Sequence, residues 1–380
     1  MKSSSSRLPG LDGVRGLAIC SVLIYHYFAI GFHFAPGSAA AYAQKFLGLS
    51  WAGVDLFFVL SGFLIGGILM DHRDAKSYFT VFYLRRAARI LPPYFLLLAG
   101  WLLIGSANVL TGETWEWLMA DCPPLWMCLL FVQNIWMGLV GEHGGNWLGV
   151  TWSLAIEEQA YLMLPLLARF LAPKWFMGVI VAMILTAPVF RLEAMSHHGL
   201  GTYVWPHCRW DGIAFGVLGA WLVRRSTFEA WRAAFCRRWL PCMIVCAAGV
   251  LLLTLFNVSI ASFGMSVAGH TWLAASSLML ILLGIKPPPG VVESVLTHPA
   301  LVWMGTISYG AYLYHQPVSG LVHAAFRAKA PAVHDLSDLM VTLVALVVTL
   351  LLAHCSWHFL ESPLLRQARQ KKYDDGKELA

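Results

Sequence analysis

Long apolar runs separated by short polar segments make up most of the chain. Each run holds about 20 residues, which is the length of helix that crosses the roughly 30 Å hydrocarbon core of a bilayer. The runs predict ten transmembrane helices, near residues 14–33, 51–70, 88–107, 151–171, 174–192, 208–223, 239–257, 266–285, 300–321 and 337–360. The pattern therefore predicts an all-α polytopic membrane protein, with one membrane domain over residues 1–365 and a charged tail over 366–380.

A further apolar stretch, Leu125–Leu139, holds about 15 residues, which is short for a crossing and typical of a re-entrant or interfacial segment. The distribution of Lys and Arg residues indicates whether this stretch crosses the membrane, because cytoplasmic loops are enriched in them. With ten spans and a cytoplasmic N-terminus, 21 of the 26 Lys and Arg lie on the cytoplasmic side and 5 outside. An extra crossing would invert the later spans and remove this bias. We therefore predict that both termini are cytoplasmic and that residues 108–150 are external.

Composition and charge exclude several other classes of protein. The chain is 58% hydrophobic and 12% charged, whereas a soluble domain carries about 25% charged residues. Its net charge of +6 is spread in short clusters between apolar runs, which membrane topology explains better than nucleic-acid binding does. The 8 cysteines form no C-x-x-C pair. We therefore expect no nucleic-acid partner, no metal and no disulfide framework.

Ionisable side chains inside the predicted spans are the main functional signal, because each costs free energy in hydrocarbon and by default marks a site or pathway. His26 lies eleven residues after Arg15, about 16 Å along a helix and beyond the middle of the membrane. Counting rise per residue in the other spans predicts one layer in the outer half of the membrane, which contains His26, Asp55, Glu157, Glu158 and His315. Two of these residues have equally good structural interpretations, since His315 could bridge helices and Asp55 could cap an interfacial helix end.

A second cluster of charge lies at the predicted cytoplasmic ends of spans. It consists of Arg15 together with Arg85, Arg86 and Arg89, of which Arg85 and Arg89 are one helical turn apart. Guanidinium groups suit bidentate recognition of phosphate, so the cluster is a candidate site for a phosphate-bearing donor. Composition alone favours the alternative that these arginines are only topology signals.

Six segments in a fixed order give the chain a resemblance to a known family. They are LPGLDGVRGLAICSVLIYHY (8–27), WAGVDLFFVLSGFLIGGIL (51–69), FYLRRAARILPPYF (82–95), TWSLAIEEQAYLMLP (151–165), RWDGIAFGVLGA (209–220) and ISYGAYLYHQP (307–317). Together they resemble the acyltransferase 3 family of bacterial inner-membrane enzymes, which O-acylate polysaccharides, lipid-linked sugars and some antibiotics. Members of this family have a basic residue followed by a histidine in the first span. By the resemblance, Arg15 and His26 correspond to this pair. A fused esterase-like domain, which many members have, is not expected here.

The resemblance, read with the residue depths, implies a role for each candidate. His26, Asp55, Glu157 and Glu158 are expected to be catalytic, with His26 as the base and one of the carboxylates orienting its ring. The donor is expected to be an acyl-CoA, by resemblance acetyl-CoA, held by Arg15, Arg85, Arg86 and Arg89. The acceptor is expected to be a hydroxyl of an envelope carbohydrate, and the candidate substrate-binding residues are His315, Arg209 and Asp211.

Several alternatives stay open at this point. The acyl group could rest covalently on His26, Ser61 or Ser153 before its transfer. The acceptor could be a small molecule such as a macrolide. A transporter or flippase of lipid-linked sugars would also need many spans with buried charges, but the chain shows no inverted repeat.

Overall fold

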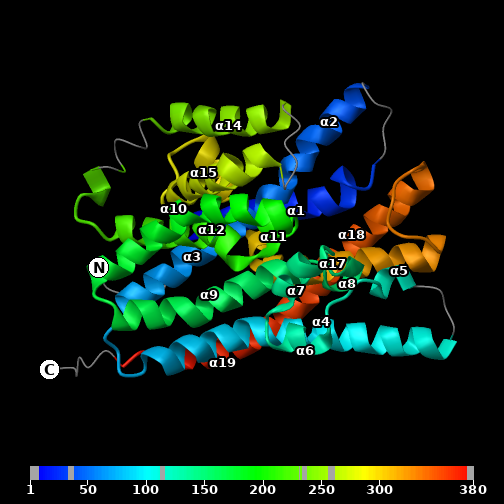
Figure 1. The fold of residues 1–380 in the computed structure, drawn as a ribbon, viewed down its shortest axis with the longest axis horizontal. Helices are drawn as coiled ribbons and strands as arrows, with labels where there is room; N and C mark the ends of the chain where they lie inside the picture. Colours follow the sequence, from blue (N-terminus) through cyan, green and yellow to red (C-terminus); the bar gives the residue numbers. More distant parts are fainter. Residues whose placement is uncertain are drawn as a thin grey trace.

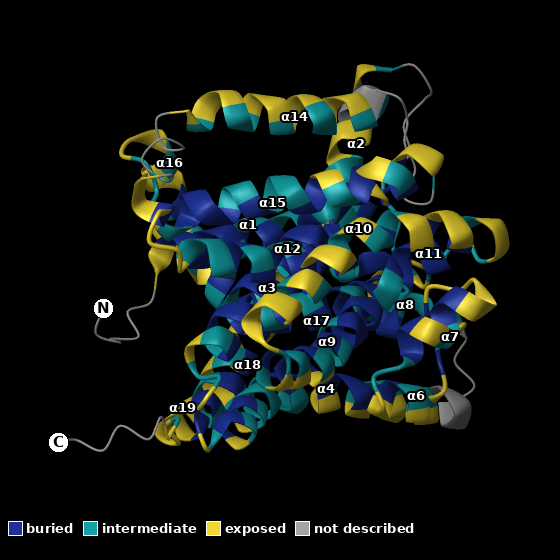
Figure 2. Cartoon of the chain, turned by 60° about the vertical axis from the view of Figure 1, so that its left-hand side comes forward, coloured by how far each residue is buried: buried dark blue, intermediate teal, exposed yellow. Residues whose placement is uncertain are grey.

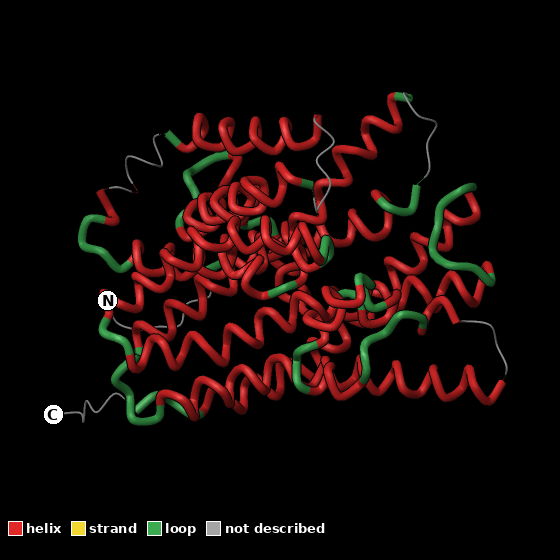
Figure 3. The backbone as a smooth tube through the Cα atoms, viewed as in Figure 1, coloured by secondary structure: helices red, strands yellow, loops and turns green. Residues whose placement is uncertain are grey.

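The computed structural model describes residues 8–32, 38–111, 116–230, 232, 238–255 and 262–374. These residues form helices joined by short loops, with no β-strand among them, as the tube in Figure 3 shows. The first half of the chain contains α1 (Pro9–Ile24), η1 (Tyr25–Ala29), α2 (Ala39–Gly48), η2 (Leu49–Ala52), α3 (Gly53–Asp71), α4 (Tyr78–Thr111), α5 (Glu116–Met119), α6 (Leu125–Leu129), α7 (Gln133–Val140), α8 (Gly145–Leu148), α9 (Thr151–Phe170) and α10 (Pro173–His197). The second half contains α11 (Gly201–Val204), α12 (Pro206–Val223), α14 (Trp239–Leu255), η3 (Met265–Gly269), α15 (His270–Ile285), α16 (Val291–Leu296), α17 (Pro299–Arg327), α18 (Leu336–Ser356), η4 (Trp357–Glu361) and α19 (Ser362–Gln370).

The all-α fold class is confirmed, and a long helix covers each predicted span. Among the described residues, five helices are long and apolar enough to cross a membrane by length and composition, namely Gln44–Asp71, Tyr78–Ser106, Pro173–His197, Met265–Ile285 and Leu336–Gln370. The helices outside this set include α1, α9, α12 and α17, each of which carries at least one candidate site residue. The full count of ten spans and the cytoplasmic termini stay predictions. Residue 33, residues 256 and 257, and 375–380 of the predicted tail lie outside the described residues.

The core of the protein lies around α3. Two thirds of its most apolar window (67%) is buried, compared with 28% for α4, α10 and the helix formed by α18, η4 and α19. Figure 2 shows the same contrast, with buried residues gathered in the central helices and exposed residues on α14 and at the periphery. A polytopic membrane protein is expected to leave its outer helices to lipid in this way, because lipid tails are as apolar as a protein core.

Glycines allow the closest contact in this core. A Cβ atom at Gly62 of α3 would collide with the Ile213 carbonyl of α12, and one at Gly216 of α12 would collide with the Val59 carbonyl of α3. Small residues at these positions therefore allow the backbones of α3 and α12 to pack closely. The two helices run side by side in Figure 1, and they hold the site residues of α3 and α12 at fixed positions.

The doubtful stretch Leu125–Leu139 is not one helix. It forms α6 and α7, broken at Phe131, whose φ is 55°. The 8 residues of α7 extend about 12 Å, too little to cross a bilayer. Asn134 Nδ2 donates to the Val204 carbonyl oxygen at 3.1 Å, so the segment turns inward and packs against α11. This geometry agrees with a re-entrant or interfacial segment and not with an extra crossing.

Candidate functional site

His26 lies in η1, a π-helical turn that extends α1. Turns of this kind are rare and often occur at functional sites. The Nδ1 atom of His26 is 3.0 Å from the Val22 carbonyl oxygen. Because a carbonyl oxygen only accepts, Nδ1 must carry the proton of the neutral ring, and the lone pair lies on Nε2. Nε2 has no hydrogen-bond partner among the described residues, so it is available as a base.

The second histidine of the site is His315 of α17. Its ring centroid lies 4.6 Å from that of His26, with the ring planes at 62°. Its Nδ1 donates to the Tyr312 carbonyl oxygen at 2.7 Å, which again leaves the lone pair on Nε2. Tyr27 fixes the backbone here, since its hydroxyl donates to the His315 carbonyl oxygen at 3.0 Å. The structure therefore brings together the two histidines that the depth argument placed in one layer.

The paired glutamates of α9 face different neighbours. Glu157 accepts a hydrogen bond from the Tyr161 hydroxyl at 3.0 Å, and that hydroxyl also contacts the Ser61 hydroxyl of α3. Glu158 has a buried Oε1 atom without a hydrogen-bond partner among the described residues. Neither carboxylate bonds to His26. Both lie within Coulombic range of Arg86, so the structure groups the two glutamates with an arginine of α4.

The predicted arginine cluster divides into two parts. Arg86 and Arg89 of α4 make no ion pair or hydrogen bond in the part of the chain that the structure describes, although the charges of both act on Glu157. Arg85 instead donates to the Lys371 carbonyl oxygen at 2.8 Å, and its guanidinium lies 5.1 Å from the centre of the Tyr373 ring. Two guanidinium groups are thus left for a phosphate-bearing ligand, whereas the third holds the C-terminal segment.

Arg15 has a different setting from the arginines of α4. It forms an ion pair with Asp12, one helical turn earlier on α1, at 3.0 Å. Its charge also acts on Glu157, which places it near the same group of carboxylates. Arg15 can therefore support the donor side electrostatically while remaining tied to α1.

Asp55 does not orient His26, which corrects the sequence-based expectation. Asp55 Oδ1 accepts a hydrogen bond from Arg209 at 2.7 Å, and the two side chains are 3% and 1% exposed. Arg209 also contacts His270. Counting rise per residue gives no direction around the helix, and the Nδ1 position of His26 is already taken by the Val22 carbonyl oxygen.

Asp211 belongs to a second buried ion pair. Its Oδ2 accepts from Arg191 at 2.9 Å and from the Thr271 hydroxyl at 2.8 Å. These bonds join α10, α12 and α15 and account for Asp211 without a substrate. The expected substrate-binding roles of Asp211 and Arg209 therefore have no support from their contacts, which are those of helix-bridging residues.

Breaking one partner of a buried ion pair costs more free energy of unfolding than breaking a surface pair, and this difference gives a stability prediction. Asp55→Leu is expected to lower the free energy of unfolding by about 3–5 kcal/mol, because Arg209 would stay buried without its partner. The double variant Asp55→Leu, Arg209→Met should recover much of this loss. Thermal unfolding in detergent measures both. The control is Asp71→Asn, which breaks a half-exposed pair with Arg224 and should cost about 1 kcal/mol or less; equal losses for Asp55 and Asp71 would contradict the interpretation.

Sequence reasoning missed Glu361, a buried carboxylate at the end of η4. It is 1% exposed, and its Oε1 accepts from the Ser356 hydroxyl at 3.1 Å. Its Oε2 is buried without a hydrogen-bond partner among the described residues, and the charge that acts on it is that of Arg89. The available signal was an acidic residue directly after the last apolar run, but the predicted span ended one residue earlier.

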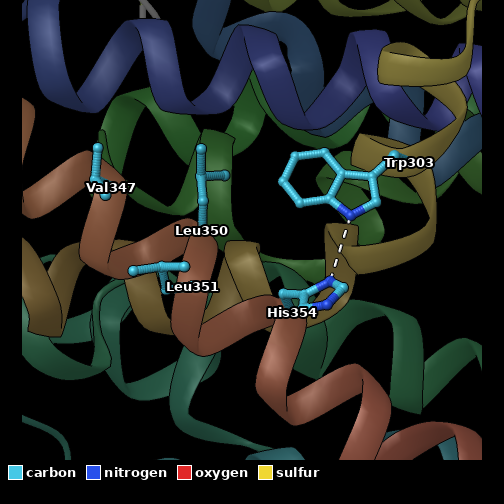
Figure 4. Close-up of a pocket in the computed structure, with 5 residues that line it drawn as sticks. All are labelled: Trp303, Val347, Leu350, Leu351 and His354. Atoms are coloured by element: carbon cyan, nitrogen blue, oxygen red, sulfur yellow. Dashed lines mark hydrogen bonds between the residues drawn. The ribbon is translucent and has the colours of Figure 1, made fainter.

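The pocket in Figure 4 is separate from this site. It lies between α17 and α18 and is lined by Trp303, Val347, Leu350, Leu351 and His354. Its one polar interaction is the hydrogen bond from Trp303 Nε1 to His354 Nδ1 at 3.4 Å. Its other lining side chains are apolar, and none of the residues that line it is a candidate site residue. Among the described residues no group of three or more His, Cys, Asp or Glu could hold a metal ion.

Comparison with known proteins decides the family. A family model described as an acyltransferase domain matches residues 8–357. The chain belongs to this family, acyltransferase 3. The match covers the residues of both histidine-bearing helices, the arginines of α4 and the glutamates of α9, so the resemblance seen in the six segments is confirmed.

Two relatives illustrate the membership. YrhL of Bacillus subtilis (strain 168), which carries the name of a peptidoglycan O-acetyltransferase, is 24% identical over 380 residues that cover 95% of this chain and 55% of YrhL. OatA of Staphylococcus aureus (strain NCTC 8325 / PS 47), which carries the name of an O-acetyltransferase, is 24% identical over 381 residues that cover 95% of this chain and 57% of OatA. The acyltransferase 3 chain thus spans little more than half the length of either relative. No solved structure matches it.

Proposed function

We propose that the protein is a multi-pass enzyme of the bacterial inner membrane that transfers an acyl group, in the first instance acetyl, from acyl-CoA to a hydroxyl of an envelope carbohydrate. The observation that carries the proposal is His26, whose ring is held through Nδ1 with Nε2 unbonded among the described residues. A neutral imidazole in this state is the common general base for a hydroxyl. Family membership supports the reaction class, and the names of the two relatives support an O-acetyl product.

The donor side of the site fits a nucleotide thioester. Arg86 and Arg89 present two guanidinium groups without ion pairs among the described residues, and guanidinium groups bind phosphate oxygens in bidentate geometry. They lie on α4, toward the end of the span predicted to be cytoplasmic, where acyl-CoA is made. A thioester anchored there by its phosphates would extend past the glutamates of α9 toward His26.

The chemistry that these residues support is direct transfer. His26 Nε2 accepts the proton of the acceptor hydroxyl while the hydroxyl oxygen forms a bond to the thioester carbonyl carbon. The C–S bond then breaks, and His26 returns the proton to the thiolate, so CoA leaves as the thiol. The Val22 carbonyl oxygen keeps the ring in one orientation through both proton transfers.

The covalent serine alternative has less support. A serine nucleophile needs a base within hydrogen-bond reach. The Ser153 hydroxyl pairs with the Tyr312 hydroxyl at 2.6 Å, and the Ser61 hydroxyl pairs with Tyr161. Neither of these two serines contacts a histidine through these bonds, so their contacts do not support activation by His26.

The test of function is a mass measurement of envelope glycans from cells with the intact gene and from matched cells without it. The proposal predicts that the glycans of the null strain lose a defined acyl mass, about 42 Da per acetyl group. A transporter of lipid-linked sugars would change the amount of glycan but not its acyl mass. Identical acyl masses in both strains, together with no turnover of radiolabelled acetyl-CoA by isolated membranes, would refute the transferase.

A further inference from the structure

One face of α17 carries three polar side chains at the center of the site. Tyr312, His315 and Gln316 are spaced i, i+3 and i+4, so they lie on the same side of the helix. Tyr312 reaches the start of α9, where its hydroxyl donates to the Val150 carbonyl oxygen at 3.2 Å. His315 contacts the ring of His26. Gln316 faces the residue between α8 and α9, since a Cβ atom at Gly149 would lie 3.1 Å from its Oε1.

Two of these side chains hold hydrogen-bond acceptors that nothing in the described part of the chain satisfies. They are His315 Nε2 and Gln316 Oε1, and both atoms are buried. His315 is fully buried, and its Nδ1 proton is already donated to the Tyr312 carbonyl oxygen, so Nε2 can only accept. Buried polar atoms normally have partners, and adjacent exceptions of the same kind need an explanation.

The missing partner must be a donor, and it must stand beside His26. Hydroxyl groups are donors without charge, which suits a site among apolar helices. The hydroxyl that His26 deprotonates would occupy the same neighbourhood. A compound with several hydroxyl groups on neighbouring carbons can present one to His26 and others to the two acceptors.

We infer that His315 Nε2 and Gln316 Oε1 form an acceptor subsite that receives hydrogen bonds from hydroxyl groups next to the one that is acylated. The inference rests on the proposed function and names the acceptor class as a polyhydroxyl compound. Gln316 is the specificity-determining residue of this subsite. The side chain as a whole is half-buried, and its buried Oε1 faces Gly149 at the end of α8.

The external segment has a backbone suited to this role. Gly144 and Gly145, which begin α8, have φ values of 81° and 64°, a region that other residues rarely adopt. The tight turn brings α8 against α17 beside Gln316. An acceptor that approaches from the outer side therefore meets α8 and Gln316 before it reaches His26.

The test compares Gln316→Met, which keeps the volume and removes the acceptor atom, with Gln316→Glu, which keeps an acceptor oxygen. Purified protein in proteoliposomes would be assayed with radiolabelled acetyl-CoA and with peptidoglycan fragments released by lysozyme as the probe acceptor. Gln316→Met should raise the KM for the fragments about tenfold, the effect of one lost hydrogen bond to a neutral group. The KM for acetyl-CoA should not change, and Gln316→Glu should restore part of the acceptor KM.

The control is Tyr314→Phe, which removes a buried hydroxyl that pairs with Ser356 on another face of α17. Its acceptor KM should equal that of the wild type. An unchanged acceptor KM in Gln316→Met would overturn the subsite while leaving the transferase intact, and so would equal rises in the KM for both substrates. A wild-type protein that transfers no label would refute the proposed function and the subsite with it.

Discussion

His26→Ala is expected to lower the rate of acyl transfer by about 10²–10⁴-fold, the usual contribution of a positioned general base. The loss should appear in kcat with little change in the KM for acetyl-CoA, because His26 has no part in holding the donor phosphates. His26→Asn should be equally inactive, since it can keep a donor toward the Val22 carbonyl oxygen but has no basic nitrogen at the Nε2 position. Turnover of radiolabelled acetyl-CoA in membranes with matched protein levels measures both variants.

The control for this experiment is His323→Gln, near the C-terminal end of the same helix as His315. His323 is fully buried, and its Nε2 pairs with the Thr342 hydroxyl at 3.0 Å. Replacing it tests whether loss of any buried histidine disables the enzyme. Full activity of His26→Ala, or equal loss in His323→Gln, would exclude His26 as the base.

The position of a residue along its helix could be predicted from the sequence, but the direction of its side chain around the helix could not. Rise per residue depends only on counting, and it correctly brought His26 and His315 together. Direction depends on how each helix is rotated by its neighbours. For that reason the sequence leaves Asp55, Glu157 and Glu158 as alternatives for orienting His26, and the structure pairs Asp55 with Arg209. Both members of that ion pair were singled out from the sequence, but their contact was not.

Two features of the site depend on geometry that carries no local signal. The π-helical turn η1 follows 16 residues of α-helix in a continuous apolar run, and it changes the direction of His26. Arg85 shares a helix with Arg86 and Arg89 but bonds to Lys371, 286 positions away in the sequence. Contacts between such distant segments arise from tertiary packing, so the local sequence of residues 85–89 gives no sign that Arg85 differs from Arg86 and Arg89.

The combined variant Arg86→Gln, Arg89→Gln is expected to raise the KM for acetyl-CoA by about 10²-fold or more, because each charge-assisted hydrogen bond to phosphate contributes about 1.5–3 kcal/mol. Each single variant should give a smaller part of the effect. The KM for the acceptor should stay unchanged, since the two arginines lie on the donor side with the α9 glutamates. Initial rates at varied acetyl-CoA concentration in proteoliposomes measure these constants.

Arg85→Gln is the matched control for the donor site, because it removes the same charge from the same helix. Its guanidinium is held by the Lys371 carbonyl oxygen and the Tyr373 ring, so the KM for acetyl-CoA should change less than threefold, about 0.6 kcal/mol. Equal effects for Arg85 and for the Arg86 and Arg89 pair would mean that the arginines act as a diffuse positive field. An unchanged KM for acetyl-CoA in the combined variant would mean that both arginines act only as topology signals. Only a large effect confined to Arg86 and Arg89 fits a phosphate site built from guanidinium groups that the protein leaves without ion pairs among its described residues.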